Sequence, residues 1–149
     1  MKSKKLSIAS DHGGFELKEE LVKKLRAAGC EIEDKGCFGK ESVDYPDFAK
    51  LVCADVKSGA AELGVLVCTS GIGMSIAANK ISGIRAALCL SADAGKFSRL
   101  HNNANVCCLG AKYLDAKTAL EIVETFIQTD FEGGRHQRRV EKFTAFENA

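Results

Sequence analysis

The apolar run Leu63–Cys68 is the feature that most restricts how this chain of 149 residues can fold. All six residues are apolar or glycine, so both faces of an extended run would be apolar. That pattern is typical of a central strand in a parallel sheet that helices cover on both sides. The run passes directly into the glycine-rich segment Thr69–Gly73. The sequence therefore predicts a buried strand that ends in a glycine-dependent loop.

Short β-forming runs alternate with stretches of helical period along the rest of the chain. Leu17, Leu21 and Leu25 recur every four residues, and Gly29 stands where such a helix naturally ends. This alternation predicts an α/β fold with a five-stranded parallel sheet and crossover helices. Strands are expected over 5–10, 31–34, 63–68, 85–90 and 105–110, and helices over 16–28, from Pro46 to about 57, and over 74–79, 92–100, 116–129 and 135–147.

Composition narrows the class of protein further. The length fits a single domain, 1–149. The formal net charge of +1 gives no general attraction to nucleic acid or to an anionic membrane, and the longest apolar run is far shorter than the roughly 20 residues that cross a bilayer. We therefore expect no nucleic-acid or membrane partner. Seven cysteines cannot all pair, and no signal-peptide-like run opens the chain, so we expect a cytoplasmic protein.

Ligands of open α/β sheets bind beyond the carboxyl ends of the strands, which draws attention to two loops. Asp11-His12-Gly13-Gly14 follows the first strand; Asp11 is either a functional acid or only a cap of the next helix. After the third strand, Gly71 and Gly73 let backbone amides face a cavity, and the next helix adds its positive end. Cys68 at that place is a nucleophile, a general base or a buried apolar residue.

A second polar group lies elsewhere in the sequence. His101-Asn102 precedes the fifth strand, and Arg135 and Arg139 are spaced four apart, so a helix would place both guanidinium groups on one face. Such paired forks suit a phosphate; the alternative is a basic surface helix for protein or RNA contact. The three histidines, at 12, 101 and 136, fall in polar segments that we expect to be exposed.

Other familiar sites are excluded by spacing. The chain lacks the Gly-Lys-Ser/Thr of a P-loop, the third glycine of the dinucleotide fingerprint, and the arginine that a cysteine phosphatase loop requires. The remaining cysteines form no Cys-x-x-Cys pair, and we interpret them as core or near-surface filling residues. We expect neither a metal nor another cofactor. These cysteines are Cys30, Cys37, Cys53, Cys89, Cys107 and Cys108.

The two polar groups are predicted to lie at opposite ends of the sheet. Segments 11–14 and 68–73 follow strands, whereas His101 and Asn102 precede one, and Arg135 and Arg139 follow the last crossover helix. One chain can hardly bring both groups together. If they serve one site, a two-fold symmetric dimer would build two composite sites.

The motifs together resemble the ribose-5-phosphate isomerase B family, which includes the galactose-6-phosphate isomerase subunits. The resemblance covers essentially the whole chain and rests on the combination of motifs. It implies a Rossmann-like, three-layer α-β-α sandwich that forms a homodimer or tetramer with sites between chains. The motifs are Asp11-His12-Gly13-Gly14-Phe15-x-Leu17-Lys18, Asp44-Tyr45-Pro46, Cys68 through Lys80, His101-Asn102-x-x-Asn105 and Gly133-Gly134-Arg135-His136-Gln137-x-Arg139.

The resemblance also implies cofactor-free aldose–ketose isomerisation of a phosphorylated sugar. Cys68 would move a proton between C2 and C1, and His101 would open the sugar ring with Asp11. The segment Thr69, Ser70, Gly71, Ile72 and Gly73 would hold the enediolate, with Ser70 contributing its hydroxyl. Asn102 would bind a sugar hydroxyl, and Arg135, Arg139 and His12 would bind the phosphate.

Three positions refine the resemblance. Met74 stands where one branch of the family carries a glutamate base, which places the chain in the cysteine branch. Ser70 stands where many relatives have threonine, and Lys112 where an arginine often contacts phosphate; lysine keeps the charge without the bidentate fork. The predicted substrate is ribose 5-phosphate. The alternatives are isomerisation of allose or galactose 6-phosphate, a noncatalytic sugar-phosphate-binding module, and a thiol redox or phosphocysteine carrier, which would form a covalent Cys68 adduct.

Overall fold

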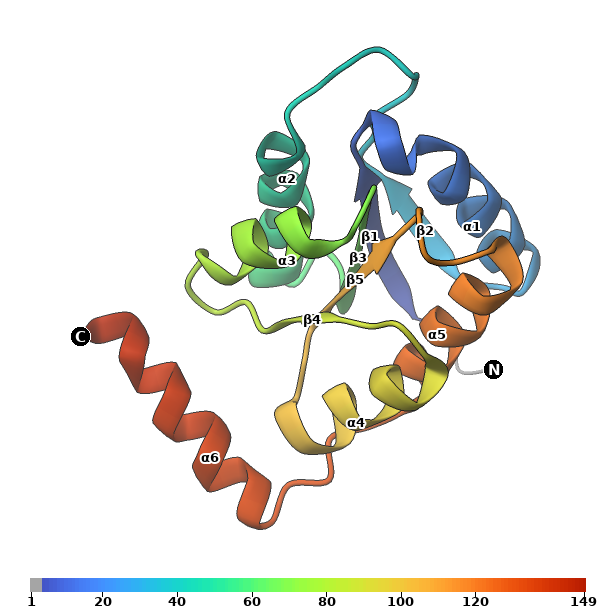
Figure 1. Ribbon diagram of the computed structural model, residues 1–149. Helices are drawn as coiled ribbons and strands as arrows, with labels where there is room; N and C mark the ends of the chain where they lie inside the picture. The colour runs from blue at the N-terminus through green and yellow to red at the C-terminus, as the bar shows by residue number, and fades with distance from the viewer. Residues whose placement is uncertain (1–3) are drawn as a thin grey trace.

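The computed structural model, which describes residues 4–149, is a three-layer α-β-α sandwich around a parallel sheet, as Figure 1 shows. The strand order is β2-β1-β3-β5-β4, and every pairing is parallel. Rossmann-like topology and five strands were both predicted, and both are confirmed. The strands are β1 (Lys5–Ser10), β2 (Glu31–Asp34), β3 (Leu63–Cys68), β4 (Ala86–Leu88) and β5 (Val106–Gly110).

Helices cover both faces of this sheet. One face packs against α1 and α5, with α4 against α5, and the other packs against α2 and α3 (Figure 1). Adjacent Cys107 and Cys108 on β5 belong to the two different cores, as alternation along a strand requires. The helices are η1 (His12–Gly14), α1 (Phe15–Ala27), α2 (Tyr45–Ser58), α3 (Ile72–Asn79), α4 (Ala92–Asn102), α5 (Ala116–Gln128), α6 (Arg135–Thr144) and η2 (Ala145–Asn148).

The C-terminal helix lies outside the two helical layers of the sandwich. In Figure 1, α6 runs past the end of α4, and the turn η2 that follows it reaches the loop after α3, where Glu147 accepts hydrogen bonds from Ser82 Oγ and the amide of Gly83, both at 2.9 Å. Only His136 and Val140 are buried on α6, and they lie four residues apart on one face. The exposed residues of α6 include both arginines singled out above, Arg135 and Arg139.

Several element ends differ from the sequence-based expectation. Helix α4 continues to Asn102 because Asn103 takes a left-handed conformation (φ 49°) and its amide closes the helix on Arg99 and Ser98. His101 and Asn102 therefore lie in a helical turn rather than in a loop. Helix α3 begins at Ile72, two residues early, and β4 keeps only three of its expected six residues. The tail helix ends at Thr144 and finishes as the 3-10 turn η2.

The helices were also compared with the length and apolar character of membrane-spanning segments. Among residues 4–149, none of them combines the length and the apolar character that crossing a bilayer would require.

Candidate active site

Cys68 ends β3 at the mouth of the glycine-rich loop, beside a backbone amide and the start of a helix. Its side chain is buried, and the backbone N–H of Gly71 donates a hydrogen bond to Sγ at 3.1 Å. Helix α3 starts one residue later, so the positive end of its dipole lies beside the thiol. An N–H donor and a helix N-terminus thus both place positive partial charge beside the sulfur.

Gly71 adopts a conformation that other residues reach only at a cost. Its φ is 77°, and a Cβ there would lie 2.5 Å from Leu88 Cδ1 and 2.9 Å from the carbonyl carbon of Leu109. The loop therefore packs against β5 so closely that only glycine fits. This contact fixes the amide that points at Cys68.

Gly71→Ala is expected to destabilise the fold far more than Gly59→Ala does. Both glycines have similar positive φ values, 77° and 81°, but nothing lies within 4 Å of a Cβ at Gly59. The control substitution should lower the free energy of unfolding by about 1–2 kcal/mol from backbone strain alone. Gly71→Ala adds the clash and should reach about 3 kcal/mol or more. Urea unfolding curves measure both values; equal losses would contradict the close packing.

The loop after β1 touches the loop after β3. A Cβ on Gly13 would lie 2.1 Å from Thr69 Oγ1, and the amide of Asp11 donates to the carbonyl of Val67. Asp11 is buried, and its Oδ1 accepts a hydrogen bond from the amide of Gly14 at 3.0 Å. The capping role that the sequence left open is thus present. The same carboxylate lies in the loop that contacts Thr69, so capping does not remove it from the site.

The remaining residues of this half surround the two loops. His12 Nδ1 accepts the amide of Val43 at 3.2 Å, which leaves Nε2 as the protonated nitrogen of a neutral ring. Ser70 Oγ accepts the amide of Ile72 at 3.2 Å, and the amide of Lys112 donates to the carbonyl of Thr69 at 2.9 Å. A single end of the sheet thus holds Asp11, His12, Cys68, Thr69, Ser70, Gly71, Ile72, Gly73 and Lys112.

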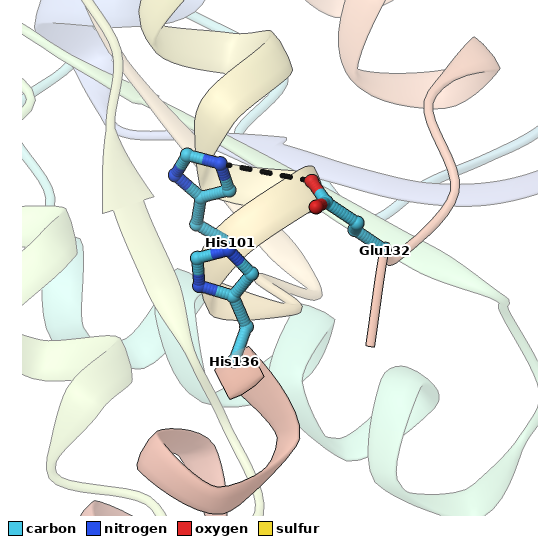
Figure 2. Close-up of side chains that lie close together, drawn as sticks. All are labelled: His101, Glu132 and His136. Atoms are coloured by element: carbon cyan, nitrogen blue, oxygen red, sulfur yellow. Dashed lines mark ion pairs between the residues drawn. The ribbon is translucent and has the colours of Figure 1, made fainter. Parts of the chain in front are cut away.

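The second half of the predicted site lies at the other end of the sheet. His101 and Asn102 occupy the last turn of α4, which leads into the amino end of β5 (Figure 1). The ring of His101 lies against that of His136 of α6 (Figure 2), and the two stacked rings have centroids 4.1 Å apart. Arg135 flanks His136 on α6, and Arg139 follows one turn later. These four predicted residues are therefore gathered by α4 and α6, away from Cys68.

Comparisons with a family profile, with a sequence relative and with solved structures decide the family. A sequence profile described as Ribose/Galactose Isomerase matches residues 6–143. The chain belongs to this family. Ribose-5-phosphate isomerase B of Escherichia coli is 43% identical over 144 residues, covering 97% of both chains. The structure of ribose-5-phosphate isomerase B from Clostridium thermocellum superposes with a TM-score of 0.95 at 46% identity, over 97% of each chain. The Thermotoga maritima enzyme gives 0.94 at 50% identity, over 96% of this chain and 99% of that one.

Membership of the ribose/galactose isomerase family confirms three expectations drawn from the sequence. The resemblance to the ribose-5-phosphate isomerase B relatives, the Rossmann-like fold and the assignment as an aldose–ketose isomerase all hold. The six other cysteines are all buried, as expected of filling residues. The roles of individual site residues stay predictions.

The sequence interpretation was wrong for His136. It is buried, with 6% of its surface exposed, because its ring packs against His101. Burial lowers the pKa of His136, and the neighbouring His101 lowers it further. Its spacing of four from Val140, on an otherwise charged helix, was the available signal.

Tyr45 is a second residue whose position the sequence did not reveal. A Cβ on Gly73 would lie 2.7 Å from the Tyr45 ring, so the start of α2 packs directly against the glycine-rich loop. The proline that follows Tyr45 lies in the first turn of α2, as predicted. Gly73 thus allows the close approach of an aromatic ring, a requirement that only the tertiary structure reveals.

Proposed function

We propose that this chain interconverts D-ribose 5-phosphate and D-ribulose 5-phosphate through an enediolate. The observation that carries the proposal is the Cys68 thiol, which accepts the Gly71 amide at the start of α3. Two supports come from outside the site: the family profile, and the names of the Escherichia coli, Clostridium thermocellum and Thermotoga maritima relatives. The wider substrate class, a phosphorylated sugar, fits the paired arginines of α6.

Groups of the protein itself carry out the proton transfer. The Cys68 thiolate takes the proton from C2 of the open-chain aldose, and the C–H electrons form the C1=C2 double bond while O1 becomes an oxyanion. The proton on O2 then passes to O1, which moves the negative charge to O2. The C1=C2 electrons take the proton of the Cys68 thiol at C1 while O2 forms the ketone carbonyl, which restores the thiolate. A sugar C–H is a very weak acid, so the oxyanion must be stabilised as it forms. The amides of 69–73 and the Ser70 hydroxyl are placed to do this.

Ring opening and phosphate binding are assigned to the other group of residues. We assign ring opening to His101, with Asp11 as its partner across the site. Asn102 binds a sugar hydroxyl. Arg135 and Arg139 bind the phosphate, with His12 and Lys112 contributing from the Cys68 end. Holding a remote phosphate lets its binding energy align C1 and C2 with the thiol.

A site assembled this way requires two chains. Cys68 and His101 lie at opposite ends of one sheet, so we propose a two-fold symmetric homodimer, alone or within a tetramer, in which each site joins the two ends. Helix α6 contacts its own chain through α4 and, by way of Glu147 in η2, through Ser82 and Gly83, and most of its surface is left exposed for a second copy to cover. Seven unpaired cysteines support a cytoplasmic location.

Arg139→Ala is expected to raise KM for ribose 5-phosphate by about 10- to 100-fold, the value of a charge-assisted hydrogen bond to phosphate. Arg135→Ala should act in the same direction. Arg138→Ala is the matched control, because Arg138 is equally exposed on α6 but points about 100° away from Arg139. Steady-state kinetics of the three variants measure the effect. Equal changes in Arg138 and Arg139 variants would contradict a specific phosphate site.

A direct assay decides the function. Purified protein incubated with ribose 5-phosphate should form ribulose 5-phosphate, and a coupled or chromatographic assay measures this product. A higher kcat/KM on allose or galactose 6-phosphate would move the assignment to the hexose phosphates. Substrate binding without turnover of any of the three would replace the enzyme by a binding module.

A further inference from the structure

His101, Glu132 and His136 form a cluster with the composition of a transition-metal site. Each offers one nitrogen or oxygen donor, and these donor atoms all lie within 4.8 Å of one another. Figure 2 shows His101 at the end of α4, His136 rising from α6 toward it, and Glu132 at the side. Two imidazoles and one carboxylate are a donor set used by Zn²⁺ and by other borderline divalent ions.

An ion pair accounts for only part of this cluster. His101 Nε2 and Glu132 Oε2 lie 3.8 Å apart, a distance that suits a weak ion pair when the imidazole is protonated. His136 takes no part in that ion pair. Only 6% of its surface is exposed, and its Nε2 has no hydrogen-bond partner among residues 4–149. Leaving such a nitrogen unsatisfied is costly, so a buried orphan beside two other donors points to a ligand.

The backbone holds the three residues near one another without the ligand. The amide of Glu132 donates to the carbonyl of Leu100 at 3.1 Å, and Arg99 Nε donates to the carbonyl of Thr129 at 3.0 Å. The segment that carries Glu132 is thereby tied to α4 beside His101. His136 follows in the first turn of α6. The cluster is thus assembled from elements that are already docked together.

Metal binding requires one imidazole to turn out of the His101–His136 stack and the Glu132 carboxylate to move closer to His101. Donors at about 2.0–2.1 Å from Zn²⁺ lie roughly 3.3 Å apart, so the carboxylate oxygen must approach His101 by about 0.5 Å. The two imidazole planes are within 12° of parallel, so one ring must rotate before both nitrogens face one ion. The outer torsion of histidine has broad wells, and Glu132 is half exposed and free to adjust.

We propose that His101, Glu132 and His136 bind one divalent transition-metal ion, Zn²⁺ as the reference, and that this ion inhibits the enzyme. Binding occupies the lone pair of His101 that ring opening uses, so metal and catalysis compete for one imidazole. The inhibitory half of the proposal rests on the proposed function; the binding half does not. Free Zn²⁺ would thus regulate the isomerase reversibly.

The binding test uses the full chain, stripped with a chelator that is then removed. Calorimetric titration with Zn²⁺ should give one ion per chain, and Co²⁺ should give visible d–d bands without a sulfur-to-cobalt charge-transfer band. Glu132→Gln and His136→Ala should each weaken the affinity by about tenfold or more. Glu121→Gln is the matched control, from outside the cluster, and should bind as the unchanged chain does.

Three results would overturn the site: no binding of Zn²⁺ or Co²⁺, equal affinity in Glu132→Gln and the unchanged chain, or a thiolate charge-transfer band. Glu132→Gln is the safer variant for folding, because it is isosteric and half exposed. Inhibition is scored separately. The Zn²⁺ concentration that halves isomerase activity should rise about tenfold in Glu132→Gln. Absence of any isomerase activity would refute the proposed function while leaving the calorimetry to judge the metal site.

Discussion

Cys68→Ser is expected to lower kcat for ribose 5-phosphate by about 10³-fold and to leave substrate binding within a few-fold. General acid–base groups contribute about 10²–10⁴ to a rate, and a serine hydroxyl does not ionise near neutral pH. The hydroxyl keeps the size of the side chain and can still accept the Gly71 amide. Isomerase kinetics and calorimetric titration with ribose 5-phosphate measure the two quantities.

Cys37→Ser is the matched control for this substitution. Its thiol is also buried, and it already donates to the carbonyl of Gly39 at 3.3 Å, a contact that a hydroxyl can make. Activity should remain within about twofold. Retention of most activity in Cys68→Ser would remove the thiol from the proton transfer. A covalent Cys68–substrate adduct in the mass spectrum would favour the thiol-carrier alternative, since the isomerase needs none.

Mixing inactive Cys68→Ala with inactive His101→Ala is expected to restore activity. If each site takes Cys68 from one chain and His101 from the other, a mixed dimer contains one intact site and one doubly substituted site. Random exchange at equal amounts makes half of the dimers mixed, so about one quarter of wild-type activity should return. Subunits are exchanged by coexpression or by refolding the mixture, and the specific activity is measured afterwards.

The control for complementation pairs Cys68→Ala with the double variant Cys68→Ala/His101→Ala. No dimer of that mixture contains Cys68, so no activity should return. Sedimentation at the assay concentration establishes the oligomeric state. A monomer that isomerises at full rate would rule out the shared site, as would failure of the first mixture to recover any activity while dimers form.

The central layers of the fold follow from local pattern. The bounds of β1, β2 and β3 agree with their expected ranges. For β3 the reason is that an apolar run between turn residues marks a buried parallel strand at both ends. The edge strand β4 was overestimated, since its residues are only half buried and its length depends on pairing with β5. The end of α4 was missed because a left-handed Asn103 is less predictable from sequence than a glycine.

The local geometry of the glycine-rich loop was predictable, because the motif carries its own geometry. Cys68 followed by two glycines at a strand end implied an amide-lined loop, and Gly71 does donate its amide to the thiol. The burial of His136 and the packing of Tyr45 on Gly73 depend on contacts between elements distant in the sequence. The hydrogen bond by which Asp11 caps the next helix was predicted only as the alternative to a functional role. Tertiary neighbours, rather than residue types, decide these cases.

The most direct test of the account is kcat/KM of the purified chain on ribose 5-phosphate, allose 6-phosphate and galactose 6-phosphate under one set of conditions. We predict turnover of ribose 5-phosphate with the highest kcat/KM of the three, and its loss in Cys68→Ser measured alongside. No turnover of any of these sugar phosphates by a folded, dimeric protein would contradict the isomerase assignment.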